Sequence, residues 1–195
     1  MSDRNVASPC VPTLSAVFSE DCIVKFPMGA KKKDVLEQLL QSLADTCELS
    51  PLAQVPALLQ NLLDRERTGT SGIGKGLALP HLRCEFVYRF VGAIGLAPDG
   101  IDFQSIDGGP TKLVFLLLGP HEQREQHIEL MGRLSALMQD KSTLMFLQGH
   151  RTPHAVHDFL EDLDARSDEG SRNASEFVTS TTAPRAVGTI GAGRR

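Results

Sequence analysis

The sequence predicts a single α/β domain in which a mixed central β-sheet is flanked by helices. Apolar segments of strand length alternate with segments whose apolar residues recur every three or four positions. One strand-length segment, residues 113–118, is apolar throughout, which is typical of a strand buried on both faces near the centre of a sheet. Near Ala165 the periodic pattern ends and Ser, Thr, Gly, Ala and Arg take over. We therefore expect a flexible leader at 1–12, one domain at 13–165 and a disordered tail at 166–195.

The expected elements follow in chain order. Strands are predicted at residues 22–26, 77–81, 90–96 and 113–118, and helices at 34–47, 122–138, 141–148 and 153–164. A further helix runs to about Arg67 and begins either at Ser50-Pro51, as a cap followed by proline, or at Pro56. The gap at 97–112, which is rich in Asp, Gly and Pro, leaves room for a short edge strand.

Composition excludes several classes of protein. The 195 residues carry a formal net charge of −4, and the densest basic cluster, Lys31 to Lys33, is expected to open a helix on a solvated face, so no nucleic-acid partner is predicted. No stretch approaches the roughly 18 apolar residues that would span a bilayer, and residues 1–12 do not resemble a signal peptide. We expect a cytoplasmic protein without direct membrane insertion.

Cysteine and histidine spacing gives no reason to predict a metal or another cofactor. Cys10, Cys22, Cys47 and Cys84 are widely spaced and are expected to be reduced, mostly packed thiols. His154 and His157 lie three residues apart, but no carboxylate completes a convincing ligand set with them.

The glycine-rich loop at 69–76 satisfies most of a Walker A pattern, G-x-x-x-x-G-K. Gly76 stands where the magnesium-binding hydroxyl would be, and the loop leads from a helix into a strand instead of the reverse. The simplest alternative is a flexible turn. Because small residues let backbone N–H groups approach an anion, a phosphate-binding role beside His81 is the functional interpretation.

Two histidines are candidates for chemistry. His81 follows Pro80 at the end of a short apolar strand, where sites are commonly built, although a partly exposed polar residue is an equally simple reading. His127 lies on the apolar stripe of its helix and needs a polar partner there. A contact between the two rings would give them a function, and the sequence alone does not establish that contact.

The stretch from Arg65 to His81, RERTGTSGIGKGLALPH, resembles the signature of the fructose/mannitol-type EIIA domains of the phosphoenolpyruvate-dependent phosphotransferase system. The segments Gln126 to Leu130 and Asp102 to Gly108 are similar to two further parts of that family. Among its branches, the chain looks most like the nitrogen-regulatory EIIA, which stands alone. Thr70-Ser71 stands where Ser-Thr is usual, and Leu82 replaces a common glycine.

The resemblance implies a function and a set of site residues. His81 would accept a phosphoryl group from an HPr-like carrier, with His127 and Arg65 beside it. The amide of Gly72 and the hydroxyls of Thr70 and Ser71 could add phosphate-binding donors. The partners that follow would be regulatory target proteins or an EIIB domain. A sugar-specific EIIA, a non-catalytic binding module and a nucleotide hydrolase remain as alternatives.

Overall fold

The computed structural model describes residues 11–46, 48–50, 54–149 and 152–180, with side chains as far as Ser167. Six strands form one sheet: β1 (Ile23–Lys25), β2 (Gly72–Gly74), β3 (Leu77–Ala78), β4 (His81–Cys84), β5 (Val91–Ile101) and β6 (Thr111–Pro120). The helices are α1 (Leu14–Val17), α2 (Lys32–Asp45), α3 (Val55–Thr68), α4 (Arg124–Leu137), α5 (Lys141–Gly149) and α6 (Pro153–Ser180), with a 3-10 turn, η1 (Glu20–Cys22).

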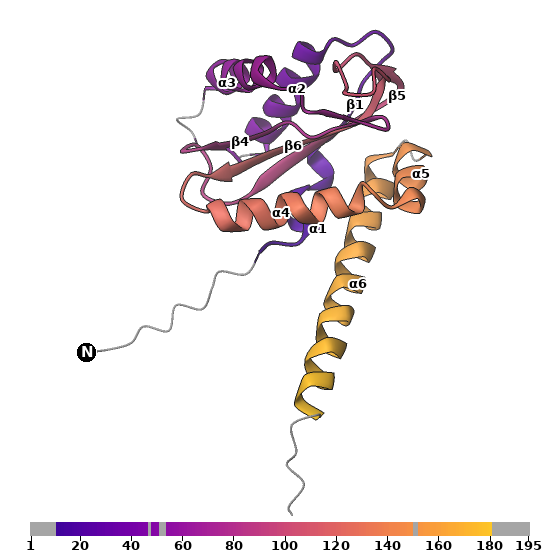
Figure 1. Ribbon diagram of the computed structural model, residues 1–195. Helices are drawn as coiled ribbons and strands as arrows, with labels where there is room; N and C mark the ends of the chain where they lie inside the picture. Colours follow the sequence, from indigo (N-terminus) through magenta and orange to yellow (C-terminus); the bar gives the residue numbers. More distant parts are fainter. Residues whose placement is uncertain (1–10, 47, 51–53, 150–151, 181–195) are drawn as a thin grey trace, which may run out of the picture.

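The sheet is mixed, as predicted, and β6 lies inside it. The strand order is β1-β5-β6-β3-β2, and β4 also pairs with β6. β5 runs antiparallel to β6, whereas β3 and β4 run parallel to it. Helices α2 and α3 cover one face of the sheet and α4 lies across the other (Figure 1). The result is a three-layer α/β domain.

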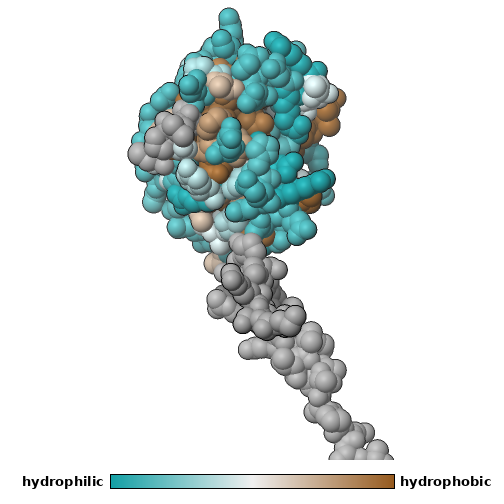
Figure 2. All heavy atoms as spheres, turned by 90° about the vertical axis from the view of Figure 1, so that its left-hand side faces the viewer, coloured by the Kyte–Doolittle hydropathy of each residue, from teal (hydrophilic) through white to brown (hydrophobic). Residues whose placement is uncertain are grey.

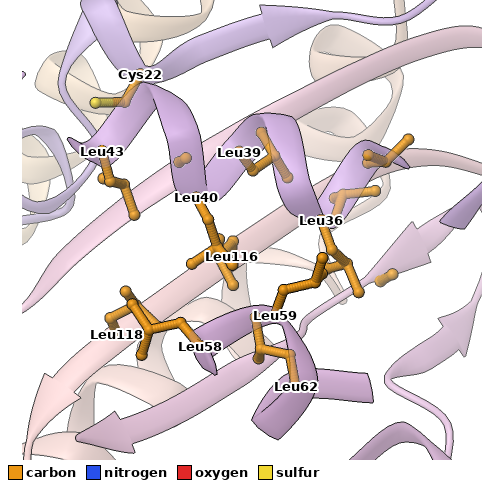
Figure 3. Packing of buried hydrophobic residues seen from close by; sticks show 14 of the residues in the cluster. Cys22, Leu36, Leu39, Leu40, Leu43, Leu58, Leu59, Leu62, Leu116 and Leu118 are labelled. Carbon is orange, nitrogen blue, oxygen red and sulfur yellow. The ribbon is translucent and has the colours of Figure 1, made fainter. Parts of the chain in front are cut away.

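The alternation of side chains along β6 explains why the sheet is covered on both faces. Val114, Leu116 and Leu118 belong to the core cluster on the α2 and α3 side. Figure 3 shows Leu116 and Leu118 packed against leucines of those two helices. The intervening Leu113, Phe115 and Leu117 belong to a second cluster that includes residues of α4, α5 and α6.

Most of the predicted elements are confirmed within a few residues. Helix α3 begins at Val55 with Pro56 in its first turn, which is the second of the two expected starts. Residues 51–53, where the other start would lie, are outside the described residues. Strand β5 continues to Ile101, and the described residues 102–110 form no separate edge strand.

The predicted strand at 77–81 is wrong in one respect that matters for the site. It is interrupted at Leu79 and Pro80, so that β3 ends at Ala78 and His81 opens the separate strand β4. Pro80 has no N–H to donate to a ladder, although its carbonyl accepts the N–H of Leu117 at 3.0 Å. His81 is therefore the first residue of a strand and not the last.

Two observations bear on the predicted boundaries of the domain, which stay predictions. Val11, inside the expected leader, is buried in the second core cluster, whereas residues 1–10 lie outside the described residues. Helix α6 continues to Ser180, beyond the boundary predicted at 165, and leaves the body of the domain (Figure 1). No proline interrupts the sequence between Pro153 and Pro184, so nothing in the chain stops the helix at Asp164. The last part of the expected disordered tail, 181–195, is not described.

Two further expectations concern the core and the membrane. Cys22 and Cys84 are free and buried, as predicted for packed thiols, while Cys10 and Cys47 are not among the described residues. Across the described part of the chain, no helix combines the length and the apolar character needed to cross a membrane.

Candidate functional site

The break between β3 and β4 positions the ring of His81. Nδ1 of His81 lies 2.9 Å from the carbonyl oxygen of Leu79, two residues earlier. A carbonyl can only accept, so Nδ1 carries a proton and, in the neutral ring, Nε2 holds the free lone pair. Nη2 of Arg65 lies 2.5 Å from Nε2 and donates to it. The backbone thus selects the tautomer, and the nucleophilic nitrogen faces a guanidinium.

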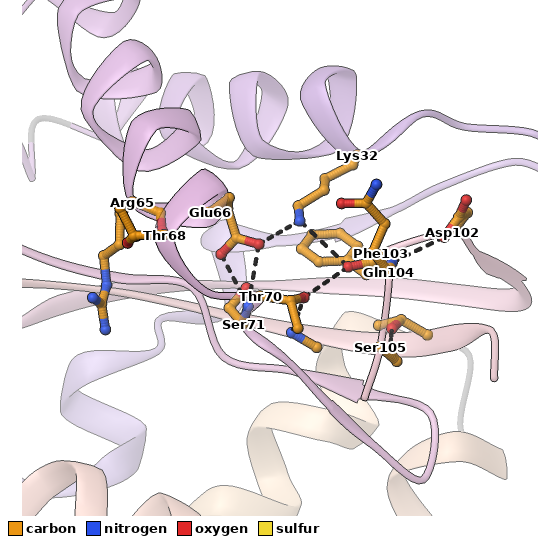
Figure 4. A network of polar contacts seen from close by, with 12 residues as sticks. Lys32, Arg65, Glu66, Thr68, Thr70, Ser71, Asp102, Phe103, Gln104 and Ser105 are labelled. Atoms are coloured by element: carbon orange, nitrogen blue, oxygen red, sulfur yellow. Dashed lines mark hydrogen bonds and ion pairs between the residues drawn. The ribbon is translucent and has the colours of Figure 1, made fainter. Parts of the chain in front are cut away.

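Arg65 comes from the last turn of α3, which is anchored by a polar network (Figure 4). The carboxylate of the next residue, Glu66, pairs with Lys32 of α2 and accepts the N–H of Ser71 at 3.1 Å. Both side chains are largely buried, Lys32 at 15% and Glu66 at 7% exposure. Lys32 also donates to the carbonyl oxygen of Phe103 at 3.3 Å. Contrary to expectation, Lys32 does not lie on a solvated face but joins three segments beside Arg65.

His127 approaches His81 from the opposite layer. It lies in the first half of α4, is only 8% exposed, and its ring centroid is 5.6 Å from that of His81. Its Nδ1 is buried and has no hydrogen-bond partner within the described part of the chain. The ring fits against Gly119, where an added Cβ would lie 2.5 Å from Cε1 of Phe90 and 3.3 Å from Nδ1 of His127. A larger residue would displace the ring of Phe90 and crowd that of His127.

Both rings are held neutral near pH 7. Burial lowers the pKa of His81, and the charge of Arg65 lowers it further, although the hydrogen bond to Leu79 opposes this. Burial also lowers the pKa of His127, which falls to about 4 with the added effects of His81, Arg83 and Arg65. Each ring therefore offers an unprotonated nitrogen without needing a base.

A pocket of about 400 Å³ opens over these residues. It is lined by three arginines, three histidines and two apolar side chains: Arg65, Arg83, Arg124, His81, His121, His127, Leu82 and Ile128. No carboxylate lines it, so its charge favours an anion. Figure 2 views the molecule from the left-hand side of Figure 1, where α3, β4 and the start of α4 lie, and shows apolar side chains gathered within a polar border.

The structure brings Arg65, His81 and His127 together but leaves the loop residues Thr70, Ser71 and Gly72 outside the pocket lining. Thr70 Oγ1 donates to the carbonyl of Phe103 at 3.0 Å and accepts the N–H of Gly72 at 3.0 Å. The N–H of Ser71 is taken by Glu66. The Thr70 hydroxyl and the Gly72 amide therefore already have partners, whereas the buried Ser71 hydroxyl has none within the described residues, and phosphate binding by this loop stays a prediction.

The glycine loop instead forms a hairpin. β2 and β3 pair antiparallel, and Lys75 at the turn has a φ of 55° with its N–H bound to Asp107 at 2.8 Å. Gly74 and Gly76 on either side also have positive φ, which glycine adopts without strain. A strand-to-helix phosphate loop has no such turn, so the Walker A resemblance is accidental.

Sequence reasoning missed Arg83 and Arg124 and treated His121 as a weak candidate. The two-residue repeat of a strand and the three-to-four-residue repeat of a helix would have identified these arginines. Arg83 is two residues after His81 in a strand, and Arg124 is three residues before His127 in a helix, so each shares a face with a histidine. The strand β4 was not predicted, so there was no reason to place Arg83 on the same face as His81.

A small group elsewhere could hold a metal ion. His157, Asp158 and Glu161 of α6 present ligand atoms within 4.8 Å of one another, with both carboxylates exposed. It is the only such group found among the described residues, and it lies outside the pocket lining. His154, the other histidine weighed from the sequence, lies 3.2 Å from Glu20.

Comparison with known proteins shows which family this chain resembles. The family described as phosphoenolpyruvate-dependent sugar phosphotransferase system, EIIA 2, matches residues 16–163. The nitrogen regulatory protein of Pseudomonas aeruginosa is 32% identical over 141 residues, covering 72% of this chain and 89% of that protein. The fructose-specific EIIABC component of Bacillus subtilis is 29% identical over 142 residues, covering 72% of this chain and 22% of that protein. The crystal structure of the nitrogen regulatory protein IIA-Ntr from Neisseria meningitidis has a TM-score of 0.67 at 26% identity, covering 75% of this chain and 97% of that one.

Proposed function

We propose that this chain, which belongs to the EIIA type-2 family of the phosphoenolpyruvate-dependent sugar phosphotransferase system, carries a phosphoryl group on Nε2 of His81. One observation carries the proposal: the lone pair of a neutral imidazole faces a pocket lined by arginines and free of carboxylates. His127 and Arg65 are the neighbouring site residues. No metal or other cofactor takes part in the scheme.

The transfer step needs little beyond positioning and charge. The Nε2 lone pair of His81 forms the new N–P bond while the bond to the donor's phosphohistidine breaks. The donor ring, protonated on its other nitrogen, takes the bonding electron pair and leaves as neutral imidazole. Nδ1 of His81 keeps its proton throughout and continues to donate it in a hydrogen bond to the carbonyl of Leu79. Arg65 moves its hydrogen bond from Nε2 to a phosphoryl oxygen, which frees the lone pair and stabilises the charge on the phosphoryl group.

The phosphoryl donor in this proposal is an HPr-like carrier protein, charged by enzyme I from phosphoenolpyruvate in the cytoplasm. We favour a regulatory role, in which target proteins read the phosphorylation state, because the similarity to nitrogen regulatory proteins extends over nearly their full length. The alternative is a sugar-specific EIIA that passes the phosphoryl group to a separate EIIB domain. The similarity to a fructose-specific component supports that alternative.

Reconstitution tests the proposal directly. The chain is incubated with phosphoenolpyruvate, enzyme I and an HPr-like carrier, and its intact mass is measured. We expect a gain of one phosphoryl group in the parent chain and none in His81→Ala. His127→Ala keeps the label but acquires it more slowly. Labelling that persists in His81→Ala would remove this residue from the role.

A non-catalytic binding module is distinguished by the partner's response. If the chain acts only by binding, its partner binds the phosphorylated and unphosphorylated forms with equal affinity, and His81→Ala behaves like the parent chain. A regulatory phosphocarrier predicts an affinity that depends on the phosphoryl group.

A further inference from the structure

Three arginines line the pocket, but only Arg65 contacts His81. A phosphoryl group brings a charge of about −1.5 to −2 near neutral pH, and one guanidinium balances only part of it. In the unphosphorylated chain His127 is neutral, because its pKa is about 4. If His81 is phosphorylated as proposed above, its ring keeps the Nδ1 proton and carries one positive charge, and a further cation in the pocket would strengthen the hold on the phosphoryl oxygens.

Arg83 is the best placed source of that charge. It lies two residues after His81 in β4, so both side chains project from the same face of the strand and line the same pocket. The hydrogen bond that holds its guanidinium is weak: Nη1 donates to the neutral carbonyl of His121 at 3.4 Å. The charge of Arg83 also contributes to the lowered pKa of His127, after burial and His81 and before Arg65, so it acts at the ring beside His81.

Arg124 approaches from the other wall of the pocket. It opens α4 and shares a helix face with His127, three residues later. No ion pair or hydrogen bond holds its guanidinium within the described residues. Other arginines of the domain are neutralised: Arg67 pairs with Asp64, Arg89 with Glu48 and Arg133 with Glu129. No carboxylate lines the pocket beside its three arginines, so their charges are available to an anion.

We propose that Arg83 and Arg124 complete the phosphoryl-binding site, with Arg83 exchanging the His121 carbonyl for an oxygen of the phosphoryl group on His81. Arg65 and Arg83 then hold the group from two sides, and Arg124 adds charge from the third. This inference depends on the proposed function for its ligand and assigns two residues that carry out that function together with Arg65. A charge-assisted contact to a phosphate is much stronger than the bond to a neutral carbonyl, so the exchange is favourable.

The lifetime and extent of phosphorylation test the inference. Arg83→Gln and Arg124→Gln are compared with the parent chain and with Arg89→Gln, which removes an equal charge from an exposed ion pair with Glu48. We expect the equilibrium share of phosphoryl group held by the chain, measured against the carrier, to fall about tenfold in Arg83→Gln and less in Arg124→Gln. We expect Arg83→Lys to hold more phosphoryl group than Arg83→Gln but less than the parent chain, because lysine keeps the positive charge and lacks the bidentate guanidinium.

A second readout works without phosphorylation. Removing the charge of Arg83 raises the pKa of His127, which is followed by NMR titration of the imidazole signals in the unphosphorylated chain. If the parent chain is phosphorylated on His81 while Arg83→Gln and Arg124→Gln both match Arg89→Gln, the inference is overturned and the proposed function stands. If the parent chain takes up no phosphoryl group on His81, the proposed function fails and the inference with it.

Discussion

A single backbone carbonyl decides which nitrogen of His81 can react. Because Leu79 accepts the proton of Nδ1, the lone pair lies on Nε2, where Arg65 and the pocket are. Had the ring been bound through Nε2, the same residues would present a protonated nitrogen to the donor. The chemistry of the site therefore depends on the kink at Pro80 as much as on the histidine itself.

Replacing Arg65 separates its role in transfer from its role in the fold. In Arg65→Gln we expect the initial rate of labelling by the phosphorylated carrier to fall by about tenfold or more, because a charge-assisted contact is lost. Arg67→Gln is the matched control, since Arg67 lies two residues later and pairs with Asp64 at the surface. Equal rates in the two variants would remove Arg65 from the transfer step.

The buried ring of His127 makes stability depend on pH. Its pKa is about 4 in the folded chain and near 6.5 when unfolded, so between these values the unfolded state binds more protons. The free energy of unfolding is therefore expected to fall as the pH drops from 6.5 towards 4, by up to about 3 kcal/mol. Urea titrations at both pH values measure this. In His127→Leu the decrease should be smaller by that amount, and an identical decrease in both chains would contradict the shifted pKa.

The sequence allowed His81, His127 and Arg65 to be named, but not the contact between them. They stand on β4, α4 and α3, and only the packing of helices on opposite faces of the sheet brings the three together. The loop residues Thr70 to Gly72 were placed at the site because they are near His81 in sequence. In the fold, the Thr70 hydroxyl and the amides of Ser71 and Gly72 are hydrogen-bonded within the domain, while the Ser71 hydroxyl is buried without a partner among the described residues.

At the scale of elements, the end of α3 is set by the ion pair between Lys32 and Glu66. The pair joins α2 to α3, while Glu66 also holds the glycine loop through the N–H of Ser71. Removing one partner of a buried pair leaves the other charge unbalanced, which costs more than an exposed pair contributes. The end of α3, which carries Arg65, is therefore held in place by its contacts with α2 and the glycine loop.

We expect Glu66→Ala to lower the free energy of unfolding by about 3 kcal/mol and to slow labelling of His81 through misplacement of Arg65. Glu129→Ala, which removes the partner of Arg133 on the exposed side of α4, should cost less than about 1 kcal/mol. Denaturant unfolding and the reconstitution assay measure the two effects. Similar stabilities for the two variants would show that the Lys32 pair contributes little.

Hydrophobic periodicity was sufficient to predict β5, β6 and the long helices, since their apolar residues face two large core clusters. It was insufficient for β3 and β4, which comprise Leu77–Ala78 and His81–Cys84 and pair with β6 across a break. Segments this short have no measurable period of their own. Their conformation is imposed by the neighbouring strand.

At the scale of the whole molecule, the last helix of the domain, α6, contacts the first helix, α1. The carboxylate of Asp164 accepts the N–H groups of Leu14 and Ser15 at 2.9 and 2.8 Å, capping the first helix from the last. Leu160 of α6 is buried and Leu163 packs against the same core cluster. The family match likewise ends at residue 163.

A chain shortened after Ser167 should therefore keep its stability and its labelling on His81, whereas Asp164→Ala should lose about 1 kcal/mol. Thermal unfolding of the two variants and the parent chain makes the comparison. A large loss on shortening would mean that residues 168–195 belong to the folded domain. That result would contradict the boundary predicted at 165.

The central claim is tested most directly by the position of the phosphoryl group on the ring. Phosphorylated chain labelled with ¹⁵N in its histidines is analysed by NMR for coupling between phosphorus and the ring nitrogens. The hydrogen bond from Nδ1 to Leu79 predicts coupling to Nε2 of His81. Coupling to Nδ1 of His81, or to another histidine, would contradict the account.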